Sequence, residues 1–274
     1  MMNDALGDRM KQYEGLECNR RFMPLLPIMA RLDGRAFHSF CKGLERPFDT
    51  RFKDLMVAVT HFLVRKTGAL IGYRQSDEIS LVFYSPDTKS QVFFDGRITK
   101  MTSMLAAMAS VEFNWLLPDY LPKKAHLSPT FDCRVWQVPT LEEAANCFLW
   151  RERDATRNSI LSAGQAEFSH KEMQGLSTSV IQDRLHELRG VNWNDYPAWA
   201  KRGTWVRRVH VQRPFTTSEI DKLPAKHEAR SNPGLIVERA EVQVIDMPSF
   251  GSVVNRADVI FHEADPVLNT EETE

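Results

Sequence analysis

Residues 69–84 read Ala-Leu-Ile-Gly-Tyr-Arg-Gln-Ser-Asp-Glu-Ile-Ser-Leu-Val-Phe-Tyr, two apolar runs separated by the polar stretch 74–78. Short apolar runs rich in branched and aromatic residues are typical of strands, and a polar interruption between them is typical of a hairpin. The stretch therefore predicts a β-hairpin with strands at 69–73 and 79–84 and a polar tip between them.

A strand and a helix precede this hairpin. Residues 24–32 form an apolar run that ends at Asp33-Gly34, the profile of a buried strand entering a turn. Asp49 is a favourable helix N-cap, and the apolar residues that follow it recur at helical spacing until Gly68, which supplies a stop. We expect a strand, then a helix, then the hairpin.

A second helix and a fourth strand follow the hairpin. Residues 92–117 are apolar on most sides and predict a helix packed against a sheet, and residues 131–139 predict a strand. The order strand, helix, strand, strand, helix, strand is the split βαβ pattern of a ferredoxin-like domain. We therefore predict an α+β fold of ferredoxin-like βαββαβ topology.

The rest of the chain predicts additional helices and a C-terminal β-hairpin. Thr140 with Glu143 forms a capping box that opens a helix, and Ser177 caps a segment that ends near Gly190. Strands at 203–212 and 234–245 are expected to pair with each other. We divide the chain into a catalytic domain with an N-terminal extension at 1–139, a helical and hairpin extension at 140–262 packed on it, and an acidic tail at 263–274 expected to fray.

Composition narrows the class of protein. A chain of 274 residues, 43% hydrophobic, can bury a substantial core, and its net charge of −1 argues against a uniformly basic nucleic-acid surface. No apolar run reaches the ~20 residues of a membrane helix and the start lacks the features of a signal peptide, so we expect no membrane association and a cytoplasmic location. The four cysteines contain no CxxC pair and are expected to be reduced and structural.

Two acidic residues are expected to meet at one edge of the predicted sheet. In a right-handed strand-helix-strand crossover the two strands are parallel, so Asp33 and the Ser76-Asp77-Glu78 tip follow strand ends on the same side. The return strand of the hairpin should lie beside the first strand and bring Asp77 near Asp33. Converging carboxylates can hold Mg²⁺, and two such ions assist in-line phosphoryl or nucleotidyl transfer.

Asp33 and Asp77 are thus the predicted catalytic metal ligands. Gly34 lets the backbone approach a metal or phosphate because it has no Cβ, and its carbonyl is a candidate third ligand. Each motif alone is also typical of an ordinary solvated turn, and only their joint placement favours a metal site.

At these residues the chain resembles the tRNA-His guanylyltransferase family and its broader group of reverse polymerases. The matching stretches span roughly residues 10–210: Arg31-Leu32-Asp33-Gly34-Arg35-Ala36-Phe37-His38, Gln75-Ser76-Asp77-Glu78, Phe131-Asp132-Cys133-Arg134-Val135, Trp150-Arg151 with Asp154, and Lys201-Arg202-Gly203-Thr204.

The resemblance implies a polymerase palm with two Mg²⁺ ions, growth of tRNA at its 5′ end in the 3′–5′ direction, and a homotetramer. ATP or GTP would activate the 5′ end, and GTP would be the usual incoming nucleotide. Asp33, the Gly34 carbonyl and Asp77 would bind metal, and Glu78 would be a supporting acid. The nucleotide site would be lined by Asp33, Gly34, Arg35, Ala36, Phe37, His38, Ser76 and Asp77.

One departure from the family bears on the reaction. Eukaryotic tRNA-His enzymes carry a His-Ile-Asn-Asn-Leu-Tyr-Asn run where this chain reads Thr156-Arg157-Asn158-Ser159-Ile160-Leu161-Ser162, so the histidine is absent. Residues 153–160 look like the guanylyltransferase-like branch associated with templated repair of truncated tRNA 5′ ends. We predict repair, with addition of the extra guanosine to tRNA-His as the alternative.

Several arginines and lysines are candidate phosphate contacts. Arg46 and Arg153 could bind triphosphate, because guanidinium groups match phosphate oxygens. The predicted RNA contacts are Arg153, Arg157, Lys201, Arg202, Arg207 and Arg208, although solvated faces of these types are also common. Trp193, Trp199 and Trp205 are expected to pack.

Two other functions fit parts of the pattern. A nucleotide cyclase also sets two acids on a ferredoxin-like palm, but its reaction needs no RNA. A catalytically idle RNA-binding module would be expected to have lost a metal carboxylate, and both are present in this chain.

Overall fold

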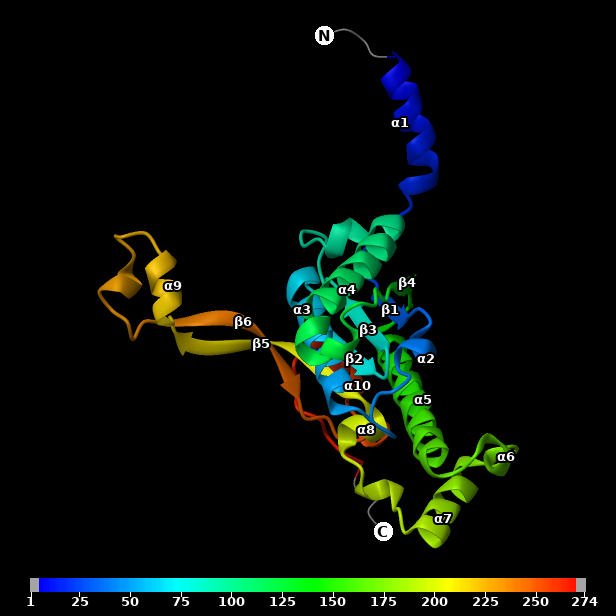
Figure 1. Ribbon diagram of the computed structural model, residues 1–274. Coiled ribbons are helices and arrows are strands. Elements are labelled where there is room, and N and C mark those ends of the chain that lie inside the picture. The colour runs from blue at the N-terminus through cyan, green and yellow to red at the C-terminus, as the bar shows by residue number, and fades with distance from the viewer. Residues whose placement is uncertain (1–4, 270–274) are drawn as a thin grey trace.

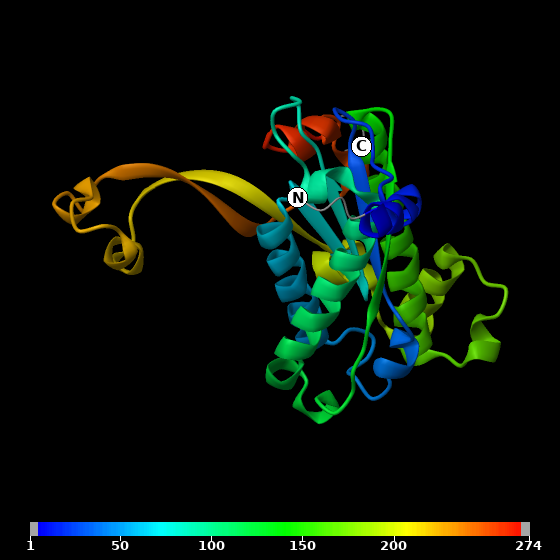
Figure 2. The same ribbon diagram turned by 90° about the horizontal axis from the view of Figure 1, so that it is seen from above.

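The computed structural model describes residues 5–269, and at its centre is one six-stranded sheet (Figures 1 and 2). Every neighbouring pair of strands in it is antiparallel, and the order across the sheet is β4-β1-β3-β2-β5-β6. The strands are β1 (Ile28–Gly34), β2 (Ile71–Gln75), β3 (Glu78–Phe83), β4 (Phe131–Gln137), β5 (Thr204–Pro214) and β6 (Ile236–Ile245).

The first four strands with two helices form the predicted βαββαβ unit. Helix α3 (Thr50–Thr67) connects β1 to β2, and α4 (Ile98–Tyr120) connects β3 to β4. Because β3 lies between β1 and β2 and is antiparallel to both, β1 and β2 run in the same direction. The ferredoxin-like α+β fold and the placement of the return strand beside the first strand are confirmed.

Helix α3 shows how local sequence produces the observed element. The Asp49 side chain accepts hydrogen bonds from the backbone N–H groups of Arg51 and Phe52, which would otherwise lack partners. At the other end Gly68 adopts the left-handed conformation, with φ 74°. The apolar side of the helix packs on the sheet together with α4, around core residues that include Leu55, Val59, Leu105 and Phe113.

The opposite face of the sheet is covered by α5 (Leu141–Glu167) and α10 (Arg256–Phe261). The Thr140 side chain accepts the N–H of Glu143, but the Glu143 carboxylate accepts from Asn146, so only half of the predicted capping box forms. Phe148 of α5 packs against Trp205 of β5 in this second core.

The remaining helices are α1 (Ala5–Cys18), α2 (Phe37–Phe40), α6 (His170–Met173), α7 (Thr178–Arg189), α8 (Ala198–Arg202) and α9 (Thr217–Lys222).

Strands β5 and β6 pair with each other, and β5 also pairs with β2. Residues 71–74 of β2 pair with residues 204–207 of β5, so the predicted C-terminal hairpin continues the sheet of the first four strands. Beyond that pairing, β5 and β6 form a two-stranded arm that projects from the body and carries α9 at its tip (Figures 1 and 2). The helix α1 also projects, and none of its residues is buried (Figure 1).

Four local predictions require correction. The hairpin tip is shorter than predicted, because Arg74 and Gln75 lie in β2 and Glu78 in β3, which leaves Ser76-Asp77 as the turn. The helix predicted at 92–117 begins only at Ile98, and its Val111 is exposed rather than packed.

The other two corrections concern the tail and the glycine of the first strand. The prediction that the tail frays was wrong for residues 264–269. The N–H of Val254 donates to the carbonyl of Val267, and the N–H of Asn269 donates to the carbonyl of Ser252, so this segment is held against residues 252–254. Residues 270–274 lie outside the described part. A Cβ at Gly34 would lie 2.3 Å from the Phe37 ring, so the space beside Gly34 is taken by this chain and not left for a ligand.

Among residues 5–269 no helix has the length and apolar character that a bilayer crossing needs.

Candidate active site

Three carboxylates form a row across neighbouring strands. Asp33 in β1 lies directly opposite Glu78 in β3 on one side and Asp132 in β4 on the other. Residues directly opposite in antiparallel strands carry their side chains on the same face. The strand pattern puts this row on the face covered by α5, because Met29 and Val82, at even spacing from these acids, belong to the core on that side.

Asp77 lies in the turn beside this row. Burial, with a smaller contribution from the negative charge of Asp33, raises the pKa of the Asp77 carboxyl to about 6 against hydrogen bonds that lower it. Asp77 directly precedes Glu78, which lies opposite Asp33 in the neighbouring strand, so the fold brings together two carboxylates that are far apart in the sequence. Ionised, they repel each other in a partly buried position, and a cation would relieve that repulsion.

The donors fit a small, oxygen-seeking cation. Asp33, the Gly34 carbonyl and Asp77 would supply oxygen ligands to such a cation, and Mg²⁺ usually completes a set of this kind with water and substrate phosphates. Across residues 5–269 no group of three or more His, Cys, Asp or Glu side chains could hold a metal alone. Asp33, Asp77 and the Gly34 carbonyl would leave coordination positions that water and a nucleotide phosphate could fill.

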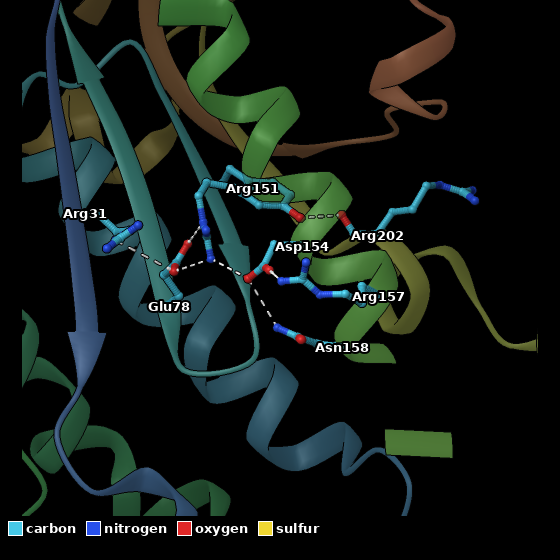
Figure 3. A network of polar contacts seen from close by, with 8 residues as sticks. Arg31, Glu78, Arg151, Asp154, Arg157, Asn158 and Arg202 are labelled. Atoms are coloured by element: carbon cyan, nitrogen blue, oxygen red, sulfur yellow. Dashed lines mark hydrogen bonds and ion pairs between the residues drawn. The ribbon is translucent and has the colours of Figure 1, made fainter. Parts of the chain in front are cut away.

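Glu78 has a different environment from Asp33 and Asp77. Arg151 of α5 donates two hydrogen bonds of 2.7 Å to its two carboxylate oxygens, and the Nε of Arg31 lies 3.9 Å from Oε2 (Figure 3). Burial raises the pKa of Glu78, whereas the bonds from Arg151 oppose that change. Because both oxygens are engaged, Glu78 fits the predicted role of a supporting acid better than that of a metal ligand.

The Glu78–Arg151 pair extends along α5. Nη2 of Arg151 also donates to Asp154 at 2.8 Å, and Asp154 accepts from Asn158 and from Arg157 (Figure 3). The network fixes the position of α5 over the carboxylate row. Arg157 keeps most of its side chain exposed in this arrangement.

The residues of the loop after β1 that were predicted to line the nucleotide site differ in exposure. Arg35, Ala36 and His38 are exposed, whereas the Phe37 ring is buried in an aromatic cluster with Phe40 and others. The prediction that Phe37 lines the nucleotide site is therefore limited to its backbone. Ala36 has φ 60° and Ser76 φ 47°, left-handed values that are uncommon for residues other than glycine.

Arg46 and the basic residues of 201–213, all predicted to contact phosphate, lie in different parts of the fold. Arg46 is exposed in the loop that leads to α3. Arg207 and Arg208 are adjacent in β5, and their guanidinium groups donate to carbonyls of different segments, Val259 and Ala264 for the first and Val64 and Arg65 for the second.

Lys201 similarly donates to the Asn194 carbonyl, and Arg202 has a buried Nε without a partner in the described part of the chain. Residues 201–213 thus do not present one continuous basic surface, because neighbours in a strand point to opposite faces. On α5, by contrast, Arg153 and Arg157 are both exposed.

Sequence reasoning missed four residues around the row. Asp132 and Arg151 lie within motifs that carried the resemblance, but their proximity to Asp33 and Glu78 depends on strand register and on the path of α5. Arg31 and Trp150 were also missed; the Arg31 and Arg151 guanidinium groups lie 5.4 Å and 4.5 Å from the centre of the Trp150 ring. The signal was present in Trp150-Arg151, which stands in a matching stretch.

A separate hollow of about 570 Å³ lies between α3 and α4. The sheet separates these helices from the carboxylate row, so this hollow is not part of the site described above. Its lining residues are Asp54, Val57, Ala58, His61, Phe62, Arg65, Glu112, Leu116 and Tyr120.

Known proteins share both the sequence pattern and the fold. The family described as tRNAHis guanylyltransferase matches residues 7–139. The tRNA(His) guanylyltransferase of Schizosaccharomyces pombe is 27% identical over 252 residues, with 86% of this chain and 91% of that protein covered.

Two solved structures extend the match. A bacterial tRNA(His) guanylyltransferase-like protein in complex with ATP is 35% identical, has a TM-score of 0.70, and covers 75% of this chain and 87% of its own. A bacterial protein of the same description in complex with GTP is 29% identical, has a TM-score of 0.69, and covers 90% of this chain and 94% of its own. The palm topology, the acidic row and these similarities agree: the chain belongs to the tRNAHis guanylyltransferase family and is a nucleotidyltransferase.

Proposed function

We propose that this nucleotidyltransferase adds nucleotides, GTP preferentially, to the 5′ end of tRNA in the 3′–5′ direction, with two Mg²⁺ ions, to repair truncated ends. The observation that carries the chemistry is the convergence of Asp33 and Asp77 at the end of β1 and in the β2–β3 turn. Relatives whose structures contain ATP and GTP support nucleoside triphosphates as substrates.

Each group of the chain has a place in this reaction. Asp33 and Asp77, with the Gly34 carbonyl, would hold the ions, which supply stabilisation of the attacking and leaving oxygens. The exposed residues Arg35, Ala36 and His38 would bind the nucleotide beside them, and the Glu78–Arg151 pair would hold the end of β3 against α5. The 5′-monophosphate would first attack the α-phosphate of ATP or GTP and release pyrophosphate. The 3′-hydroxyl of the incoming nucleotide would then attack the activated 5′-phosphate and release the activating nucleoside monophosphate.

Thr156 favours repair over the addition of an unpaired guanosine. It stands on α5 where the eukaryotic tRNA-His enzymes carry histidine, two residues after Asp154 of the polar network. Without special contacts to an unpaired end, the reacting groups would depend on a templating base for alignment. Addition of the extra guanosine to tRNA-His is the second candidate, because the relatives in fungi carry that name.

The test is competition between two RNAs. A tRNA that lacks its first 5′ nucleotide and a full-length tRNA-His transcript are offered together with all four labelled nucleotides. Repair predicts faster extension of the truncated tRNA and a product that follows Watson–Crick complementarity. Faster guanosine addition to full-length tRNA-His, whatever base lies opposite, would establish the second candidate, and a cyclic nucleotide formed without RNA would refute both.

We also propose a homotetramer, in line with the family. Light scattering of the purified chain is the direct measurement, and a monomeric mass at micromolar concentration would refute it.

A further inference from the structure

Trp150 lies within an exposed stripe on α5. Asn146, Trp150, Arg153 and Arg157 are all exposed, and their spacing of four, three and four residues places them on one side of the helix. The Trp150 side chain is 52% exposed, although a large aromatic ring is normally mostly buried. One side of α5 thus carries an exposed indole ring, that of Trp150, followed by the two exposed cationic side chains of Arg153 and Arg157.

The indole is held in place by arginines of the active-site network. The guanidinium carbon of Arg151 lies 4.5 Å from the centre of the ring and that of Arg31 lies 5.4 Å from it. Both arginines also contact Glu78, whose Oε2 is 2.7 Å from Nη2 of Arg151 and 3.9 Å from Nε of Arg31 (Figure 3). Cation–π contacts with groups that are themselves fixed restrict the ring, which lowers the entropy lost when a ligand stacks on it.

The position along β1 separates this surface from the predicted nucleotide loop. Arg31 precedes Asp33 by two residues, about 7 Å along a strand, whereas the loop at 35–38 follows Asp33 on its other side. Trp150 therefore flanks the carboxylate row on the side away from the loop. A group bound there would approach the reacting atoms from the direction opposite to the incoming nucleotide.

We propose that Trp150 is a stacking platform for an unpaired nucleotide of the RNA, with Arg153 and Arg157 contacting the phosphates that follow it. This inference rests on the proposed function and adds the surface that holds the end of the RNA. An aromatic ring beside cationic groups is the usual arrangement for binding single-stranded nucleic acid, because every base has a face that can stack. A single unpaired nucleotide can turn its base onto the ring, whereas the terminal pair of a blunt end can bring its outer face there only together with the whole rigid stem, so the platform favours an unpaired end.

The experiment compares two RNA hairpins that share one acceptor stem, one with an unpaired terminal nucleotide and one blunt. Binding is measured without nucleotide triphosphates for the full chain and for three variants. Trp150→Ala should weaken binding of the hairpin with the unpaired nucleotide about 10-fold and weaken binding of the blunt one clearly less. Trp150→Phe should retain most of the affinity, because a phenyl ring still stacks.

Trp115→Ala is the matched control. Trp115 lies on α4, is 79% exposed and has no cation over its ring among the contacts of residues 5–269, so its removal should leave both affinities unchanged. An equal loss for both hairpins in Trp150→Ala would show that the ring only supports Arg31 and Arg151, and would overturn the platform. Unchanged RNA affinity with a raised KM for GTP would assign the ring to the incoming nucleotide and overturn it as well.

The binding measurement separates this inference from the proposed function. If the chain extends no RNA but its preference for the unpaired end still depends on Trp150, the proposed function fails and the platform stands. If extension of truncated tRNA is observed and Trp150→Ala binds both hairpins like the unaltered chain, the platform alone fails.

Discussion

Asp77 occupies a position in which burial and the charge of Asp33 both oppose ionisation, so its carboxylate is suited to a bound cation. We expect Asp77→Asn to lower the rate of nucleotide addition at least about 100-fold, because the uncharged amide is a poor ligand for Mg²⁺. Single-turnover addition of labelled GTP to truncated tRNA is the measurement. The fold should persist, since the substitution removes an unfavourable charge.

Asp119→Asn on α4 is the control for that substitution. This acid is exposed, and α4 covers the face of the sheet opposite to the row, so its removal should leave the rate unchanged. Addition at a near-normal rate by Asp77→Asn would eliminate the proposed metal ligand.

Glu152 predicts a dependence of stability on pH. Burial raises the pKa of this carboxyl to about 7, and its Oε1 accepts the N–H of Phe250 while Oε2 has no partner among residues 5–269. The folded chain therefore favours the protonated form. This contribution to stability is fully present below about pH 4.5 and is lost as the pH rises through about 7.

We expect Glu152→Gln to be more stable than the unaltered chain above pH 8, by about 3 kcal/mol at most, because its amide needs no ionisation and can still accept from Phe250. The two proteins should differ less at pH 5. Urea unfolding at both pH values measures this difference, and an identical difference at pH 5 and pH 8.5 would rule out the titration of Glu152 as its cause.

The residues that sequence alone could identify are those in compact motifs. Asp33 and Asp77 were found because each follows an apolar run at a turn. Asp132 and Arg151 were not, since Asp132 meets Asp33 through strand register and Arg151 reaches Glu78 across 73 residues of chain. Their roles depend on packing that no local pattern specifies.

Between elements, the Glu78–Arg151 pair joins β3 to α5, and both side chains are buried. Arg151→Met should destabilise the fold by about 3 kcal/mol, because it removes both short hydrogen bonds to the buried Glu78 carboxylate and leaves it only the more distant Arg31, at 3.9 Å. Adding Glu78→Gln should recover part of that loss, since no buried charge then remains. Urea unfolding of the single and double variants gives the coupling energy, and strictly additive losses would show that the pair contributes no specific interaction.

Helices were more predictable than strand partners. The ends of α3 were predicted from Asp49 and Gly68, and the structure has the cap at each position. The start of α7 at Ser177 and its end at Gly190 were likewise confirmed. The pairing of β5 with β2 was missed, because an apolar strand carries no local indication of which edge it will join.

For the molecule as a whole, α1 and the arm lie outside the packed body (Figure 1). Removing residues 1–16 should change the free energy of unfolding of the body by less than about 0.5 kcal/mol, because α1 buries no residue. Urea denaturation of the truncated and intact chains at the same protein concentration measures this. A marked loss of stability would mean that α1 packs against another copy, since a single helix of this length is marginal in water.

The strand order also determines what a growing chain exposes as it leaves the ribosome. Strands β1, β2 and β3 are complete by residue 83 and can pair at once, but their outer partners β4 and β5 arrive only after residues 130 and 203. Until then the nascent sheet has two open edges with unsatisfied backbone groups, the usual starting point for edge-to-edge aggregation. Fragments truncated between these points should therefore require a chaperone to stay dispersed. A fragment that includes β4 has the same β4 edge as the complete sheet, and only β2 then lacks its native partner.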